Sequence, residues 1–412
     1  MQLAGDGALG HLTYCTNIHA AEHWQDMHTG LARHLPAIKQ AVSADAPMGV
    51  GLRVAASAAK SLSDPENFES LRELLGHDYY VFTINGFPYG TFHGQRVKEG
   101  AYRPDWSEPE RLAYTNLLAD QLAELLPDGV TGSVSTVPCT FKPWLENNPH
   151  RGDLLNTIVE HLLQHAAHLV KLGQRSGNTI VLALEPEPFC LLETIDETIA
   201  FFESSLFCES AVTRLASLTG LGRAAAEEAL HRHLGVCYDV CHAAVEYEDA
   251  VASVENLRAA GIDIAKLQLS SALKVSNVDA TTAAALRPFD EPVYLHQTMQ
   301  RRDGQITRFV DLDGALLRIE EAVGAEWRSH FHVPIFLEEM EQFSTTQDFL
   351  RDILALHLRF PISNHLEVET YTWDVLPEQY RNVDLGAAIA RELAWVRTRL
   401  EDPCAEDSSG TA

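Results

Sequence analysis

Residues 179–185 read Thr-Ile-Val-Leu-Ala-Leu-Glu, and Pro186 follows directly. A run of apolar and β-branched residues that a proline ends is typical of a short buried strand in a parallel sheet. In such a strand Val181, Ala183 and Glu185 share one face, because side chains alternate. The stretch therefore predicts a buried strand that presents a carboxylate at its C-terminal end.

Similar runs predict further strands, and long amphipathic segments typical of helices separate them. The strands lie near 12–16, 48–55, 79–84, 131–136, 234–239, 262–269 and 366–371, and helices are predicted over, for example, 22–42, 65–76, 108–126, 152–175 and 191–231. This alternation indicates right-handed crossovers and a parallel sheet. Eight such strands predict an α/β fold, a closed (β/α)8 TIM barrel. An open doubly wound sheet is the alternative, but no glycine-rich phosphate turn follows the first strand.

We expect residues 1–400 to form one barrel domain with two insertions. Residues 191–233, before strand six, are long enough for two helices, and residues 287–336, before strand eight, contain short β-like runs. The polar segment 401–412 is rich in small residues and predicts a flexible C-terminal tail.

Composition and charge exclude several classes of function. The 412 residues include 31 Lys and Arg against 58 Asp and Glu, a formal net charge of −27. This excess argues against a nucleic-acid partner, because phosphates bind clustered Lys and Arg, and against anionic lipid. No apolar run is long enough for direct membrane insertion. Seven scattered cysteines with no Cys-x-x-Cys pair, and an N-terminus unlike a secretory signal, predict a cytoplasmic protein with reduced thiols.

The C-terminal ends of the other late strands also carry polar residues, at the end of a barrel where active sites lie. Strand six ends in Asp239, with His242 three residues further on, and strand seven presents Gln268 on its polar face. Strand eight carries Glu367 and Glu369 on one face. Two such acids repel each other unless a cation or a base lies between them. This strand gives the strongest local signal for a metal.

Four rim positions on consecutive strands therefore predict a divalent-metal site, with Glu185, Asp239, Gln268 and Glu369 as ligands. Oxygen ligands with a nearby imidazole suit Mn2+, Zn2+, Co2+ or Fe2+ better than Ca2+. Two alternatives stay open. His242 could simply cap the next helix while Asp239 is structural, or Cys237 and Cys241 could help to hold zinc.

The Glu, Asp-x-x-His, Gln and Glu at these strand ends resemble those of the xylose-isomerase-like barrel superfamily. Longer strings resemble the EboE family of metabolite traffic proteins, and together they span nearly the whole chain. These strings are Thr13-Tyr14-Cys15-Thr16-Asn17-Ile18-His19, Thr83-Ile84-Asn85-Gly86-Phe87-Pro88-Tyr89-Gly90, Phe92-His93-Gly94, Pro104-Asp105-Trp106, Phe141-Lys142, Tyr294-Leu295-His296-Gln297, His330-Phe331-His332-Val333-Pro334 and Glu369-Thr370-Tyr371-Thr372-Trp373-Asp374. The chain departs from the family at Ala20-Ala21-Glu22, where relatives are expected to have Pro-Gly-Glu.

The resemblance implies a xylose-isomerase-like barrel that binds a divalent metal, namely Mn2+, Zn2+, Co2+ or Mg2+. It implies that Glu185, Asp239, Gln268 and Glu369 are metal ligands, and that His242 and His332 are ligands or neighbours of a second ion. It also implies a place in a secondary-metabolite biosynthesis or export pathway, whose other proteins are possible partners, and a cyclitol-like ligand.

Further polar residues follow predicted strands or lie in glycine-containing loops. We expect Asn17, Asn85, His93, His242 and His296 to bind substrate, and Lys142 or His19 to hold an oxyanion. Individually, each of these residues is more often an ordinary loop residue than a catalytic one. Their shared end of the barrel is what makes them candidates.

The function that these expectations favour is metal-dependent isomerisation or epimerisation of a small sugar, polyol or cyclitol. Glu185 and Glu369 would abstract and return a proton while the ion chelates adjacent oxygens. One alternative is a metal-dependent hydrolase of a small phosphoester. Another is a metabolite-binding traffic protein without catalysis, since a barrel fold does not specify chemistry.

Overall fold

The computed structural model describes residues 1–3, 7–94, 96–279, 281–378 and 384–401. The predicted tail, apart from Glu401, lies outside the described residues. No helix within these ranges is long and apolar enough to cross a membrane.

Eight parallel strands form one sheet in the order β1-β14-β7-β6-β5-β4-β3-β2. They are β1 (His11–Tyr14), β2 (Met48–Arg53), β3 (Tyr79–Asn85), β4 (Gly132–Thr136), β5 (Ile180–Leu184), β6 (Leu234–Asp239), β7 (Asp263–Leu269) and β14 (His365–Val368). Each lies where the sequence predicted a strand, and the TIM-barrel prediction is confirmed. The last strand ends at Val368, so Glu369 is the first residue beyond it.

The two outer strands of this order, β1 and β2, meet and nearly close the barrel. Cys15 and Gly51 form a parallel bridge. The Thr13 hydroxyl donates a hydrogen bond to the Gly49 carbonyl at 2.8 Å and accepts one from the Gly51 amide at 2.9 Å. A side chain therefore supplies part of the pairing that backbone groups provide elsewhere in the barrel.

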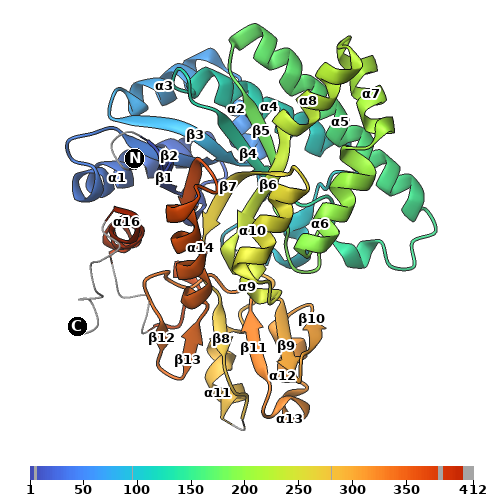
Figure 1. The fold of residues 1–412 in the computed structure, drawn as a ribbon. Helices are drawn as coiled ribbons and strands as arrows, with labels where there is room; N and C mark the ends of the chain where they lie inside the picture. The colour runs from blue at the N-terminus through green and yellow to red at the C-terminus, as the bar shows by residue number, and fades with distance from the viewer. Residues whose placement is uncertain (4–6, 95, 280, 379–383, 402–412) are drawn as a thin grey trace.

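Helices surround the barrel in the upper part of Figure 1. They are α1 (Trp24–Val42), α2 (Ala56–Ser61), α3 (Pro65–Leu75), α4 (Pro109–Leu125), α5 (Arg151–Ser176), α6 (Ile195–Phe201), α7 (Glu209–Thr219), α8 (Arg223–His233), α9 (Val240–Val245), α10 (Ala250–Ala259), α14 (Gln347–Arg359) and α16 (Leu385–Glu401). The segment 191–233 holds three of them, α6 to α8, rather than two. Helix α3 shows why a start is well defined: the Asp64 side chain accepts from the Glu66 amide at 2.9 Å, and Pro65 has no amide to satisfy.

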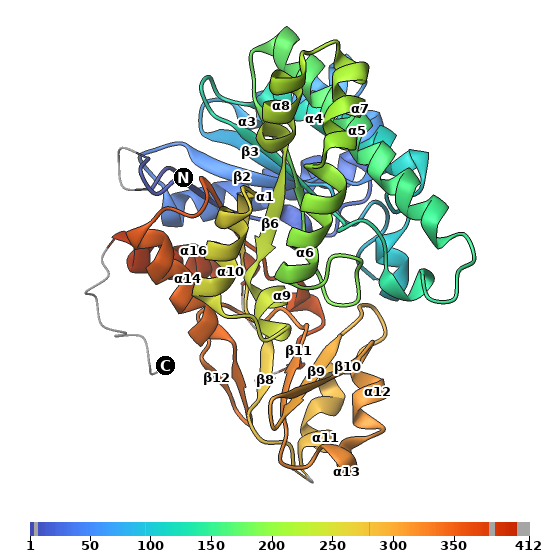
Figure 2. The same cartoon turned by 45° about the vertical axis from the view of Figure 1, so that its right-hand side comes forward.

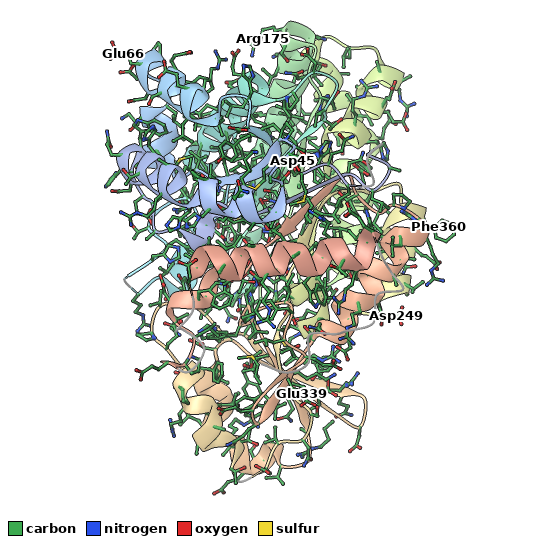
Figure 3. All side chains as sticks on the ribbon, turned by 90° about the vertical axis from the view of Figure 1, so that its left-hand side faces the viewer. Asp45, Glu66, Arg175, Asp249, Glu339 and Phe360 are labelled. Carbon is green, nitrogen blue, oxygen red and sulfur yellow. The ribbon has the colours of Figure 1, made fainter. Side chains whose placement is uncertain are left out.

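A second, antiparallel sheet is inserted between β7 and α14, with the order β10-β9-β11-β8-β13-β12. Its elements are β8 (Leu273–Val275), α11 (Thr282–Leu286), β9 (Thr298–Arg302), β10 (Gln305–Phe309), α12 (Leu312–Leu316), α13 (Ile319–Ala322), β11 (Glu326–Ser329), β12 (Glu339–Met340) and β13 (Phe343–Thr345). Figures 1 and 2 show it as a separate lobe on the side to which β7 leads. In Figure 3, Glu339 marks this lobe, while Glu66 and Arg175 lie at the opposite end of the molecule.

The inserted sheet extends beyond the predicted 287–336 on both sides. Strand β8 begins four residues after the end of β7 at Leu269. With only three residues, β8 is too short to be recognised as a separate strand in the sequence. Strands β12 and β13 are too short to stand out by periodicity.

The barrel interior holds a buried ion pair between Lys266 of β7 and Glu367 of β14, both fully inaccessible to solvent. Burial opposes the charge on Lys266, but Glu367 outweighs it and raises the pKa of the ammonium. Gly51 leaves room for this pair, because a Cβ built at that position would lie 1.7 Å from Glu367 Oε1. Strand β2 must therefore carry a residue without a side chain at this position.

We expect the substitution Gly51→Ala to destabilise the protein by about 1–3 kcal/mol or more, since a methyl group is forced into a filled interior. Urea unfolding followed by circular dichroism measures the change. Gly30→Ala in α1 is the matched control, because its Cβ would meet only an ordinary contact at 3.9 Å and alanine favours helix. Equal stability of the two variants would contradict the account of the interior.

Candidate metal and substrate site

A cavity opens at the C-terminal end of the barrel, between strand ends and the inserted lobe. Both parts of the chain line it. The lining residues are Asn17, Phe87, Pro88, Phe92, Lys98, Ala101, Tyr102, Glu185, Glu187, His242, Tyr294, Leu295, His330, His332, Glu369 and Tyr371. The cavity is therefore lined both by polar groups that can bind a cation and by aromatic side chains.

Three carboxylates converge at this end of the barrel. One oxygen each from Glu185, Asp239 and Glu369 lies within 4.8 Å of the others, and all three side chains are buried. Glu185 Oε2 and Asp239 Oδ2 have no hydrogen-bond partner among the described residues. Gln268 lies beside the Glu369 carboxylate, yet both of its amide atoms lack a hydrogen bond in the same part of the chain. Buried polar atoms without partners indicate a missing ligand.

Two asparagines orient Glu369. Asn17 Nδ2 donates to Glu369 Oε1 at 2.6 Å, and Asn85 Nδ2 donates to the same oxygen at 3.1 Å. The hydroxyl of Ser270 and the amide of His242 hold Asp239 in the same way, donating to its Oδ1 at 2.7 and 3.1 Å. Glu369 and Asp239 thus each have one oxygen fixed by the protein.

Burial and repulsion perturb these acids. Burial first, and then the charge of Asp239, raise the pKa of Glu369 to about 8. Burial, then Glu369 and Asp239, raise the pKa of Glu185 well above its ordinary value. Without a cation, the group therefore retains a proton near neutral pH.

Three histidines converge beside the carboxylates. His330 Nε2 lies 3.1 Å from His242 Nε2 and 3.2 Å from His332 Nε2. Their other ring nitrogens face acceptors: His242 Nδ1 donates to the Pro186 carbonyl at 2.9 Å, and His332 Nδ1 donates to the Glu369 carbonyl at 2.8 Å.

The other ring nitrogen of His330 faces Gln297. Its Nε2 donates to the Tyr102 hydroxyl at 2.8 Å and to the Pro188 carbonyl at 3.2 Å, so its Oε1 accepts from His330 Nδ1 at 2.8 Å. Burial lowers the pKa of His330 well below its ordinary value and that of His332 to about 4. With each Nδ1 engaged as a hydrogen-bond donor, the three rings turn their Nε2 atoms toward one another, which is the donor set of a divalent-metal site.

Two further residues belong to this second cluster. Glu187 offers an oxygen within 4.8 Å of ligand atoms of His242 and His330, and Cys241 offers sulfur within the same distance of His330 and His332. The Tyr102 hydroxyl donates to Glu187 Oε1 at 2.7 Å, whereas Glu187 Oε2 lacks a partner among the described residues.

Aromatic side chains form the other wall of the cavity. Phe92, Tyr294 and Tyr371 pack in one cluster with ring centroids 4.9–5.1 Å apart. His93 ties this wall to the barrel: its Nε2 donates to the Asn17 carbonyl at 2.5 Å, and its Nδ1 accepts from the Tyr294 hydroxyl at 3.0 Å.

Three other predicted site residues, Lys142, His19 and His296, do not line the cavity. Lys142 forms ion pairs with Glu193 and Glu197, and His19 Nε2 lies 3.1 Å from the Tyr14 hydroxyl. Neither lines the cavity within the described residues. His296 lies behind the cavity, where its Nδ1 donates to the His330 carbonyl at 3.0 Å.

Comparisons with known proteins support this fold. A xylose isomerase-like TIM barrel protein from Mycobacterium smegmatis, in complex with magnesium, matches 95% of this chain and 96% of its own length, with a TM-score of 0.51 and 12% sequence identity. The fold is that of a xylose isomerase-like TIM barrel. An IolI protein with a bound zinc atom matches 95% of this chain and 97% of its own at a TM-score of 0.42 and 12% identity. A D-allulose 3-epimerase from Methylomonas sp., in complex with D-allulose, matches 69% of this chain and 83% of its own length, with a TM-score of 0.35 and 14% sequence identity. No family model matches the chain, and no curated protein sequence matches it.

Sequence reasoning did not name His330 as a residue of the candidate site. A signal for His330 was present: in an extended segment, His330 and His332 share a face because they are two residues apart. Tyr102 and Gln297 gave no signal of this kind, since only the fold brings them to His330.

We expect metal affinity to rise with pH up to about 8 and to level off above it. The raised pKa of Glu369 means that an incoming ion must displace a proton at neutral pH, which costs about tenfold in affinity per pH unit for one proton. Titration of the metal-free protein with Mn2+ by calorimetry at pH 6, 7, 8 and 9, in buffers of different ionisation enthalpy, measures affinity and proton release. A constant affinity across this range would contradict the assignment of Glu369 as a metal ligand that must lose a proton.

Proposed function

We propose that this chain is a divalent-metal-dependent isomerase or epimerase that acts on a small sugar, polyol or cyclitol. The observation that carries the proposal is the buried group Glu185, Asp239 and Glu369, whose oxygens converge within 4.8 Å. No lysine or arginine pairs with these carboxylates in the described part of the chain. Oxygen donors of this kind suit Mg2+, Mn2+, Co2+ or Zn2+.

The residues present fit such an ion. Glu185, Asp239 and Glu369 would hold it, and the unpaired amide oxygen of Gln268 is a fourth candidate ligand. When bound, a divalent ion would polarise a carbonyl and so acidify the C–H of the neighbouring carbon, which bears a hydroxyl.

The chain's own groups would handle the proton. Glu185 and Glu369 are the proposed pair that takes a proton from the substrate carbon and returns it. Asn17 and Asn85 keep Glu369 in one orientation through their hydrogen bonds to Oε1. The inserted lobe and the aromatic wall line the cavity, and they would limit the access of water to a reactive intermediate.

A hydrolase of small phosphoesters is the second candidate. The three histidines with Nε2 atoms 3.1–3.2 Å apart favour it, because a second ion there would stand beside the first across Asp239. Two adjacent ions can activate water and stabilise a leaving oxygen. A place in a secondary-metabolite pathway, as the EboE resemblance suggests, is compatible with either reaction and with a metabolite-binding role.

We expect Glu185→Gln and Glu369→Gln to lose bound metal and any isomerase activity while the fold is kept, because each removes one charged ligand from a preformed site. Metal per chain is measured by elemental analysis after Mn2+ loading and desalting, and the fold by circular dichroism. Glu66→Gln, on the exposed outer surface (Figure 3), is the control and should keep wild-type metal content. If both site variants retained stoichiometric metal, the assignment would be wrong.

A further inference from the structure

Among the described residues that line the cavity, the buried side-chain atoms without a hydrogen-bond partner are acceptors. Asn17 Oδ1, Glu185 Oε2 and Glu187 Oε2 are buried and lack a partner among the described residues, and all three residues line the cavity. Such atoms are satisfied by a ligand that donates hydrogen bonds or by a cation. A phosphate or carboxylate brings acceptors and negative charge, and would add to the repulsion already present.

The cations near the cavity are already engaged. Lys98 lines it, but its ammonium forms an ion pair with Asp311 at 2.6 Å and donates to the Glu291 carbonyl at 3.1 Å. Lys98 also has a positive φ of 42°, and its amide donates to the Val293 carbonyl at 2.8 Å. The residue therefore links the barrel to the inserted lobe and has little freedom to turn toward a ligand.

Arg53 is the second cation, and it lies behind Phe92 with 3% of its surface exposed. One terminal nitrogen donates to the Ala21 carbonyl at 2.9 Å, and the other donates to the Pro88 and Gly90 carbonyls. The guanidinium therefore holds the loop that carries Phe92.

The aromatic wall completes the environment. Phe92, Tyr294 and Tyr371 are each less than a tenth exposed, and they line the same cavity as the acceptors. Flat apolar surfaces of this kind pack against C–H groups and poorly against a hydrated phosphate.

From these observations we infer that the cavity selects an uncharged polyol, rich in hydroxyl donors, and excludes phosphorylated or carboxylated forms of the same compound. The inference rests on the proposed function for its reaction. It adds the charge of the substrate and assigns the exclusion to Asp311, which neutralises Lys98.

Calorimetric titration of Mn2+-loaded protein with matched probes tests this selection. The probes are D-fructose with D-fructose 6-phosphate, and myo-inositol with myo-inositol 1-phosphate. We expect at least one free polyol to bind, and its phosphate to bind at least tenfold more weakly. A phosphate that binds as tightly as its free partner would overturn the inference, as would the absence of binding by both free polyols.

The variant Asp311→Asn sharpens the test, because it removes the charge that occupies Lys98 but keeps an acceptor for the His296 and Leu312 amides. One released ammonium should strengthen phosphate binding by about tenfold relative to the free polyol. The double variant D311N/K98M should lose this gain. An unchanged ratio in soluble, folded D311N would show that Lys98 plays no part in the exclusion.

Failure of this inference and failure of the proposed function are distinguishable. Metal content and turnover test the function, whereas the ratio of two affinities tests the selection. If the protein bound Mn2+ but preferred the phosphates, the metal site would stand and the selection of uncharged polyols would be wrong.

Discussion

Glu185, Asp239 and Glu369 bring three carboxylates within 4.8 Å of one another in a buried site. At an effective dielectric constant of 20, two unit charges at that separation repel each other by about 3 kcal/mol. A fold can retain such a group only if neighbouring residues, protons or a cation offset the repulsion.

Other residues of the chain offset part of this repulsion. The positive charge of Lys266, inside the barrel, lowers the pKa of both Glu185 and Glu369, although burial and repulsion outweigh it. Glu367 holds that ammonium in place, and the missing side chain at Gly51 makes room for Glu367. Asn17 and Asn85 add two hydrogen bonds to Glu369. What remains is charge that a divalent ion would neutralise, so the interior of the barrel and its mouth form one electrostatic unit.

The inserted lobe contributes further residues to the site. It contributes His330 and His332, which complete a histidine cluster with His242 of the barrel. It also contributes Tyr294, which hydrogen-bonds to His93 and packs in the aromatic wall. The lobe is therefore part of the site rather than an addition to its edge, and the pairing of Lys98 with Asp311 joins it to the barrel.

The sequence predicted the barrel well because a buried parallel strand is a local pattern. In β5, the apolar run before Glu185 is enough to recognise the strand and the residue at its end. The same reasoning located Asp239, Gln268 and Glu369, since the end of a strand determines which residues meet at the barrel mouth. All three lie at or directly beyond strand ends in the structure.

The rest depends on contacts that have no local pattern. Lys142 follows β4, as a catalytic residue would, but Glu193 and Glu197, just before and within α6, pair with it. Sequence position does not reveal that pairing. His330 lies in an insertion whose strands are short, so its approach to His242 follows from the packing of the lobe on the barrel. The extent of that insertion was underestimated because its outer strands β8, β12 and β13 have only two or three residues each.

Anomalous diffraction from crystals loaded with Mn2+ tests the central claim most directly, because it locates the ion without reference to any activity. The account predicts an anomalous peak about 2.0–2.3 Å from oxygens of Glu185, Asp239 and Glu369. A fully occupied peak elsewhere with none at these carboxylates, or no peak at saturating Mn2+, would contradict it.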